Sequence, residues 1–200
     1  MKSIVIIEDH PVMRRGLAEF FAATGRWELR GSAGTLEQAR VLLKRLDLET
    51  LDILLLDIQL GDGWGLDLLP ALRERGGKLP LTAVYSAFED YAHARAALDC
   101  GAQGYIPKSR DEGELEAALL RLLQEGVYLD GAIREGGVSF LDALNRLTKR
   151  EGEVFSLVKN GLSNKAIAEK LSISRRTVEN VLSCIYDKTG VPSRRELQNL

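Results

Sequence analysis

The sequence predicts an α/β protein in which a five-stranded parallel, doubly wound sheet is followed by a small all-α domain. Three observations favour this fold class. In residues 1–125, five short apolar runs alternate with five segments of helical periodicity. After residue 145 only helical periodicity remains. With 200 residues, 45% of them hydrophobic, the chain is long enough to form two cores.

The five expected strands are short apolar runs of the buried type. They are rich in valine, isoleucine and leucine, and three of them lead into acidic or hydroxyl side chains. Because a helix follows each strand, the connections are expected to be right-handed crossovers between parallel strands. The strands are expected at residues 4–7, 27–33, 53–56, 81–85 and 103–106.

The helices between these strands have apolar residues three and four positions apart, and several have recognisable ends. Pro11 suits the first turn of one helix, and Thr35 can cap the next. Gly101 stands where a C-terminal cap is expected. The five helices are expected at 11–23, 35–46, 66–75, 91–100 and 112–124.

A change of composition separates the two predicted domains, which cover residues 1–125 and 146–200. Residues 126–145 contain four glycines and no long apolar periodicity, so we expect a linker with a helix near 138–144. Ser163 and Ser174 are suited to cap two helices of the second domain. That domain is expected to have helices at 149–159, 164–171, 175–188 and 193–200.

Charge is distributed unevenly along the chain. The formal net charge is −2, yet residues 142–200 carry 11 basic and seven acidic residues, which leaves +4 there and −6 in the remainder. A small basic domain is a candidate for binding a polyanion such as DNA.

Cysteine usage and hydropathy favour a cytoplasmic protein. Cys100 and Cys184 lie far apart, which excludes a disulfide-rich scaffold and favours a reducing compartment. The apolar run at 4–7 is far too short for a secretory signal or a membrane span. We therefore expect no membrane partner.

Acidic, hydroxyl and amine side chains follow four of the expected strands: Glu8 and Asp9, then Asp57, Ser86 and Lys108. The carboxyl ends of parallel strands meet at one edge of a sheet, where ligands bind. Two like charges about 4 Å apart cost about 4 kcal/mol at an effective dielectric constant of 20, so three carboxylates at this edge need a cation. Oxygen ligands suit Mg²⁺ or Mn²⁺ better than Zn²⁺.

These residues, together with Tyr105, resemble in order and spacing the receiver domain of bacterial two-component response regulators. The resemblance covers roughly residues 1–125 and implies a flavodoxin-like fold. It also implies that Asp57 accepts a phosphoryl group from the phosphohistidine of a sensor kinase. A carboxylate nucleophile would form an acyl phosphate in that reaction.

The resemblance assigns roles to the neighbouring residues as well. The implied metal ligands are Glu8, Asp9, Asp57 and the backbone carbonyl of Gln59. The implied phosphoryl-stabilising and switch residues are Ser86, Ala87, Tyr105 and Lys108. Lys108 and Ser86 would contact phosphoryl oxygens, Ala87 leaves room for the group, and Tyr105 would turn inward as Ser86 moves. The sequence departs from many receivers at Gly61, where they have proline, and at Pro107, which precedes rather than follows the lysine.

A second motif lies in the basic domain. A helix, a turn capped by Ser174 and a second helix fit a helix-turn-helix, whose second helix enters the major groove. The segments 147–154, 161–168, 171–174 and 177–180 resemble the LuxR-type DNA-binding domain. With the receiver, this domain is similar to response regulators of the NarL/FixJ family.

The resemblance implies that seven residues contact DNA. Those expected to face the groove are Glu179, Asn180 and Ser183, and those expected to contact phosphates are Lys165, Arg175, Arg176 and Lys188. Many relatives have lysine at the position of Glu179 and histidine at that of Val181. An acid cannot donate a hydrogen bond to guanine, but it can accept one from cytosine N4.

Taken together, these patterns favour a phosphorylation-switched transcriptional regulator over an enzyme. Phosphorylation of Asp57 would alter dimerisation and promoter binding, and the implied partners are a sensor histidine kinase, double-stranded promoter DNA and a second copy of the chain. A receiver that acts by protein contact without phosphorylation stays open as an alternative. A metal-dependent phosphatase is disfavoured, because the chain lacks a G-x-S-x-G motif and a second aspartate two residues after Asp57.

Overall fold

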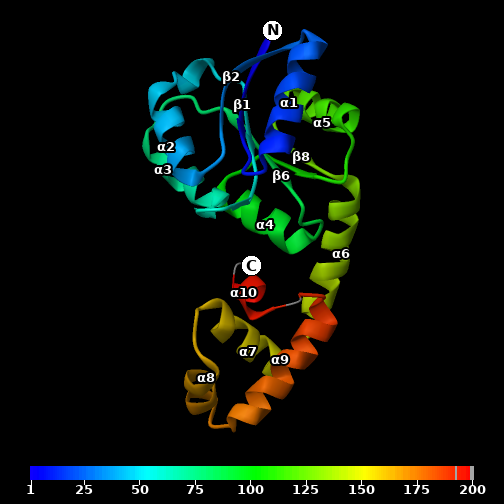
Figure 1. Ribbon diagram of the computed structural model, residues 1–200. Helices are drawn as coiled ribbons and strands as arrows, with labels where there is room; N and C mark the ends of the chain where they lie inside the picture. The colour runs from blue at the N-terminus through cyan, green and yellow to red at the C-terminus, as the bar shows by residue number, and fades with distance from the viewer. Residues whose placement is uncertain (192, 199–200) are drawn as a thin grey trace. The chain divides into compact units, whose positions relative to one another are not determined.

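The computed structural model describes residues 1–191 and 193–198, and of residues 136–142 and 196 only the backbone. Contacts divide the chain into two compact units, each described by itself below (Figure 1). The first comprises Met1–Glu89 and Ala97–Asp130, and the second Asp90–Ala96 and Gly131–Leu200.

The first unit is built on a parallel sheet with the strand order β2-β1-β3-β6-β7-β8. The strands are β1 (Lys2–Ile7), β2 (Trp27–Ala33), β3 (Ile53–Leu56), β6 (Leu81–Ser86), β7 (Gly104–Pro107) and β8 (Tyr128–Leu129). The predicted fold class is confirmed, but the sheet has one strand more than the five expected. β8 adds only two residues, paired with Gly104 and Tyr105, and two residues are too few to show a period of two along the sequence.

Helices cover both faces of this sheet. α1 (Pro11–Thr24) and α5 (Glu112–Glu125) lie on one face, and α2 (Leu36–Arg45) and α3 (Leu68–Glu74) on the other (Figure 1). α4 (Tyr91–Cys100) connects β6 to β7 in the chain. Pro11 occupies the first turn of α1, and the Thr35 side chain accepts a hydrogen bond from the Gln38 N–H at 3.1 Å, as the capping residues predict.

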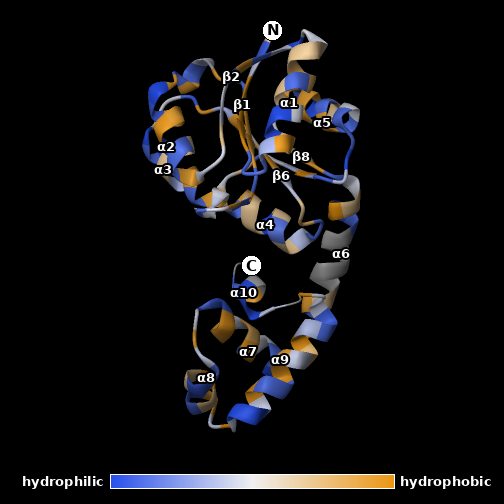
Figure 2. Ribbon diagram, in the orientation of Figure 1, coloured by the Kyte–Doolittle hydropathy of each residue, from blue (hydrophilic) through white to orange (hydrophobic). Residues whose placement is uncertain are grey.

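The core of the first unit fills the space between the sheet and helices α1 and α5. Alternate residues of β1 and β3 are buried there: Ile4, Ile6, Ile53 and Leu55. Phe21 and Leu119 reach the same cluster from the two helices. Each such side chain contributes about 1.5–3 kcal/mol when fully buried. Figure 2 shows hydrophobic residues along β1 and hydrophilic ones on the outer surface of the helices.

A small antiparallel ribbon follows β3, where only a loop was expected. β4 (Gln59–Leu60) pairs with β5 (Gly63–Trp64), and a turn of 3-10 helix (Gly65–Asp67) leads into α3. Asp62, in the turn, accepts hydrogen bonds from the backbone N–H groups of Leu36 at 2.7 Å and Glu37 at 3.1 Å. A Cβ atom on Gly65 would lie 2.0 Å from the carbonyl oxygen of Asp57, so this position admits only glycine.

The second unit consists of helices joined by short loops, with no strand among its described residues. Its helices are α6 (Gly131–Asn145), α7 (Lys149–Lys159), α8 (Asn164–Leu171), α9 (Arg175–Thr189) and α10 (Arg194–Gln198). Val154, Ile167, Val178 and Ile185 are buried in a common core. Ser163 and Ser174 cap α8 and α9, as predicted. Within the described residues, no helix combines the length and hydropathy needed to cross a membrane.

The segment 126–145 is more regular than the sequence indicates. It contains β8, which belongs to the first unit, and the whole of α6, where a helix was expected only near 138–144. The last predicted helix, 193–200, is observed as α10, and residues 199 and 200 lie outside the described residues. The domain boundaries at 125 and 146 stay predictions.

Candidate functional site

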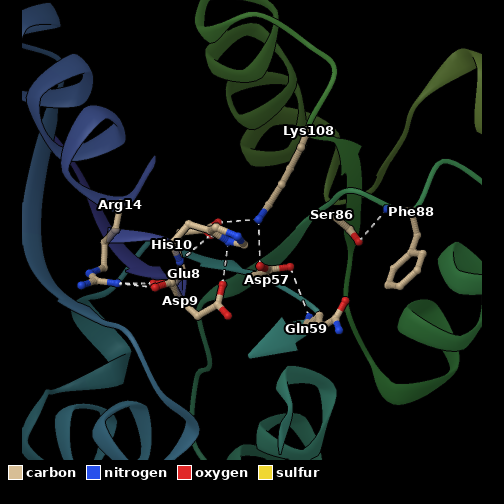
Figure 3. A network of polar contacts seen from close by, with 9 residues as sticks. All are labelled: Glu8, Asp9, His10, Arg14, Asp57, Gln59, Ser86, Phe88 and Lys108. Atoms are coloured by element: carbon tan, nitrogen blue, oxygen red, sulfur yellow. Dashed lines mark hydrogen bonds and ion pairs between the residues drawn. The ribbon is translucent and has the colours of Figure 1, made fainter. Parts of the chain in front are cut away.

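Three carboxylates and one ammonium group meet at the carboxyl edge of the sheet (Figure 3). Glu8 and Asp9 follow β1, Asp57 follows β3, and Lys108 follows β7. Glu8 and Asp57 are only 1% and 5% exposed. Lys108 Nζ lies 2.7 Å from Glu8 Oε2 and 2.8 Å from Asp57 Oδ2. The strand order thus brings together four side chains that are 100 residues apart along the chain at most.

The two central groups of this cluster affect each other's ionisation. Burial raises the pKa of Asp57, and the neighbouring charge of Glu8 adds to the effect, while the hydrogen bond from Lys108 opposes it. Desolvation lowers the pKa of Lys108, but its interactions with the Asp57 and Glu8 carboxylates outweigh desolvation, and the net pKa is raised. Lys108 is therefore a cation at neutral pH, and Asp57 is a more basic carboxylate than an exposed aspartate.

The acidic cluster fits a hard divalent cation. Ligand atoms of Glu8, Asp9, His10 and Asp57 lie within 4.8 Å of one another. Glu8 Oε2 and Asp9 Oδ1 are buried and accept no hydrogen bond of good geometry, although Lys108 and His10 lie close to them. Clustered carboxylate oxygens of this kind are the ligands that Mg²⁺ and Mn²⁺ prefer.

A cavity of about 430 Å³ opens onto the cluster. Asp9, Asp57 and Lys108 contribute charged atoms to its wall, and Ser86 and Ala87 contribute a hydroxyl and a methyl group. Gln59 also lines the cavity, and its backbone N–H donates a 3.2 Å hydrogen bond to Asp57 Oδ1. All the predicted phosphoryl-site residues except Glu8 and Tyr105 therefore line one space.

Ser86 and Tyr105 are connected through Phe88. The Phe88 N–H donates to Ser86 Oγ at 3.2 Å, and the Tyr105 hydroxyl donates to the Phe88 carbonyl oxygen at 2.8 Å (Figure 3 shows the first of these bonds). Ser86 and Tyr105 are both fully buried, so the tyrosine ring lies inward in this structure. The backbone N–H of Lys108 donates to the Ser86 carbonyl oxygen, which links the strand ends of β6 and β7.

All seven predicted DNA contacts are exposed polar residues of α8 and α9. Val178, Leu182 and Ile185 of α9 point into the core, and the opposite side of the helix is exposed. The predicted contacts that are exposed are Lys165, Arg175, Arg176, Glu179, Asn180, Ser183 and Lys188. Along α9, hydrophobic and hydrophilic residues accordingly alternate in Figure 2.

Two family models match different parts of the chain. The family of response regulator receiver domains matches residues 4–120, and the luxR family of bacterial regulatory proteins matches residues 145–200. The chain is 33% identical to the nitrate/nitrite response regulator NarP of Escherichia coli over 96% of its own length and 90% of that protein. It is a response regulator of the NarL/FixJ family.

Other relatives of this response regulator are also similar over nearly its whole length. The DNA-binding transcriptional activator DevR/DosR of Mycobacterium tuberculosis is 30% identical over 98% of this chain and 92% of its own length. A structure of RcsB from Salmonella enterica, bound to a promoter in the presence of a phosphomimetic, superposes with a TM-score of 0.73. That alignment covers 100% of this chain and 97% of the RcsB chain at 23% identity, and it supports the fold.

Two interactions of the response regulator were missed from the sequence. Arg14, in the first turns of α1, donates through Nη1 to the backbone carbonyl oxygens of Glu8 at 2.5 Å and Asp9 at 3.3 Å, and so holds the acidic pair in place. Its only sequence signal is a basic residue soon after two acids. Lys188, whose phosphate contact stays a prediction, also pairs with both carboxylate oxygens of Glu151 on α7 at 2.7 and 2.8 Å.

Proposed function

We propose that this response regulator is switched by phosphorylation of Asp57 and regulates transcription by binding promoter DNA. One observation carries the proposal: Asp57 is a buried carboxylate of raised pKa that faces a cavity between a lysine and two further acids. A sensor kinase phosphohistidine is the donor. An Asp57 oxygen forms a bond to phosphorus, the bond between phosphorus and the imidazole nitrogen breaks, and the imidazole keeps that electron pair.

The residues around Asp57 have separate tasks in this reaction. Lys108 pairs with Asp57 and Glu8 in this structure, and after phosphorylation its ammonium group would form an ion pair with a phosphoryl oxygen. Ser86 presents a hydroxyl to the same cavity, and Ala87 limits the bulk of its wall. Glu8, Asp9, Asp57 and the carbonyl group of Gln59 would hold Mg²⁺, which supplies positive charge to the phosphoryl oxygens.

The response to phosphorylation starts at the loop after β6. When the Ser86 hydroxyl turns toward a phosphoryl oxygen, it releases the Phe88 N–H, and Phe88 is also the residue whose carbonyl oxygen holds Tyr105. A change at Ser86 is thereby passed to Tyr105 through one residue. We propose that this change alters dimerisation and, with it, promoter binding.

DNA binding is assigned to the second unit. Its α8 and α9 form a helix-turn-helix with exposed Lys165, Arg175 and Arg176 placed for phosphate contacts. A relative named as a DNA-binding transcriptional activator and an RcsB structure solved with promoter DNA support the same assignment. A sensor kinase, double-stranded DNA and a second copy of the chain are therefore the proposed partners.

Intact-mass analysis after treatment with acetyl phosphate and Mg²⁺ tests the phosphorylation site. The wild-type chain and the control Glu19→Gln, an exposed acid on α1, should gain one phosphoryl group, and Asp57→Asn should gain none. Incorporation into Asp57→Asn would show that another residue is the acceptor. A wild-type chain that gains no phosphoryl group from acetyl phosphate or from a kinase would identify a receiver that acts by protein contact alone.

A further inference from the structure

The exposed side of α9 has little positive charge beyond its first turn. Arg175 and Arg176 open the helix, and the charged residues that follow are Glu179, Asp187 and Lys188. Lys188 is engaged by Glu151 of α7. The surface that a major groove would meet is therefore acidic or neutral over most of its length, so attraction to phosphates cannot explain its composition.

Glu179 occupies the part of α9 that matters most for base recognition. In a helix-turn-helix the N-terminal residues of the second helix contact base edges. α9 begins at Arg175, with Ser174 as its cap, so Glu179 lies within its first half. Its neighbour Val178 is buried, Glu179 itself is exposed, and within the described residues it makes no ion pair. Nothing in the second unit's own packing accounts for an acid at this position.

The chemistry of a carboxylate restricts what it can read. It only accepts hydrogen bonds, and in the major groove guanine and the thymine ring offer acceptors that repel it. Adenine has a donor at N6, but the adjacent N7 is an acceptor, which suits an amide better than a carboxylate. Cytosine N4 is a donor with an acceptor on one side only, the O6 of the paired guanine, whereas adenine N6 lies between N7 and the O4 of the paired thymine. We infer that Glu179 selects cytosine at one position of each half-site; this inference rests on the proposed DNA-binding function.

A pair of charge-matched variants tests the inference. Glu179→Gln and Asp187→Asn each replace an exposed acid of α9 by its amide, but Asp187 lies two turns further along, in the C-terminal half. Each full-length variant is selected on a randomised duplex library at two salt concentrations. Both should bind non-specific sequences more tightly, since each loses one negative charge. Only Glu179→Gln should change a base preference, from cytosine to adenine at one position per half-site, by roughly tenfold.

The outcomes separate the inference from the function on which it rests. A wild-type chain that selects no duplex, with or without acetyl phosphate and Mg²⁺, overturns the DNA-binding function and the inference together. Selection of a common site by the wild type and by Glu179→Gln, with unchanged base preferences, overturns the role of Glu179 alone. A change of preference in Asp187→Asn equal to that in Glu179→Gln would assign the effect to charge and would also overturn it.

Discussion

The ammonium group of Lys188 lies 2.8 and 2.7 Å from the two carboxylate oxygens of Glu151. The same carboxylate closes a capping box with Thr148 at the start of α7. The hydrogen bond from Lys188 lowers the pKa of Glu151, with the Thr148 backbone N–H acting in the same direction. A lysine that the sequence assigns to DNA therefore connects α7 to the end of α9.

Lys188→Ala should lower the stability of the second unit and leave the salt dependence of DNA binding almost unchanged. Arg176→Ala should do the reverse, reducing the slope of log K against log salt by about one, because Arg176 is exposed and placed at the first turn of α9. Thermal unfolding and binding titrations at several salt concentrations measure the two effects. A slope reduced equally in both variants would show that Lys188 contacts a phosphate as well as Glu151.

Mg²⁺ should stabilise the first unit against unfolding. At a free concentration a hundredfold above Kd, a ligand that binds only the folded state adds about 2.7 kcal/mol. Asp9→Asn should abolish the rise in Tm, since Asp9 Oδ1 is one of the buried acceptors without a hydrogen bond. Glu19→Gln, on the exposed surface of α1, should keep it. An equal rise in Asp9→Asn would exclude Asp9 as a ligand.

The raised pKa of Asp57 predicts how stability depends on pH in metal-free protein. The folded state binds this proton more tightly than the unfolded chain, so the Asp57 contribution is unaffected below the ordinary value of 3.8. As pH rises from 3.8 to the raised pKa of Asp57 in the folded state, the free energy of unfolding falls, because the folded state must give up a proton that the unfolded chain has already lost. Asp57→Asn should therefore be more stable than wild type at neutral pH, and the difference should vanish in acid. Urea unfolding across this range measures it, and an Asn variant less stable at neutral pH would contradict it.

A bidentate ion pair secures the residue before α6. Arg110 donates through Nε and Nη2 to the two oxygens of Asp130 at 2.9 and 2.8 Å, and Asp130 is buried. Arg110→Ala should lower Tm by several degrees because it withdraws two hydrogen bonds from a buried carboxylate. Arg110→Lys should fall in between, since an ammonium group cannot pair in the same planar way. Equal Tm values for the lysine variant and wild type would show that the bidentate geometry is unimportant.

Sequence patterns predicted the parts of the fold that repeat over many residues. The runs at 4–7 and 53–56 and the helices over 149–159 and 164–171 are found where the apolar spacing places them. β8 and the β4–β5 ribbon have two residues per strand, so they exist through pairing with neighbours rather than through a pattern of their own. In α6, the glycines favour irregular structure, and the helix forms despite that weak preference.

The candidate site, like the fold, could be predicted only in part. The proximity of residues at the strand ends was predictable, because the carboxyl ends of parallel strands lie at one edge of the sheet. Asp57, Glu8 and Lys108 are indeed in contact. The contacts of Arg14 and Lys188 depend on how helices and loops pack against each other, and no periodic pattern in the sequence indicates that packing. Lys188 and Glu151 are 37 residues apart, and only the packing of α7 on α9 places them in contact.

The carboxylate of Asp62 ties the turn beyond Asp57 to the first N–H groups of α2, at Leu36 and Glu37. These two hydrogen bonds restrict the motion of the loop that follows Asp57. A proline at the position of Gly61 would restrict the same loop by fixing its backbone φ angle. The loop after Asp57 and the start of α2 should therefore be transferred together when receiver domains are recombined. A chimaera that imports the loop from another receiver without a matching start of α2 would have a more mobile loop next to Asp57, and a chimaera that carries both segments would keep the loop in place.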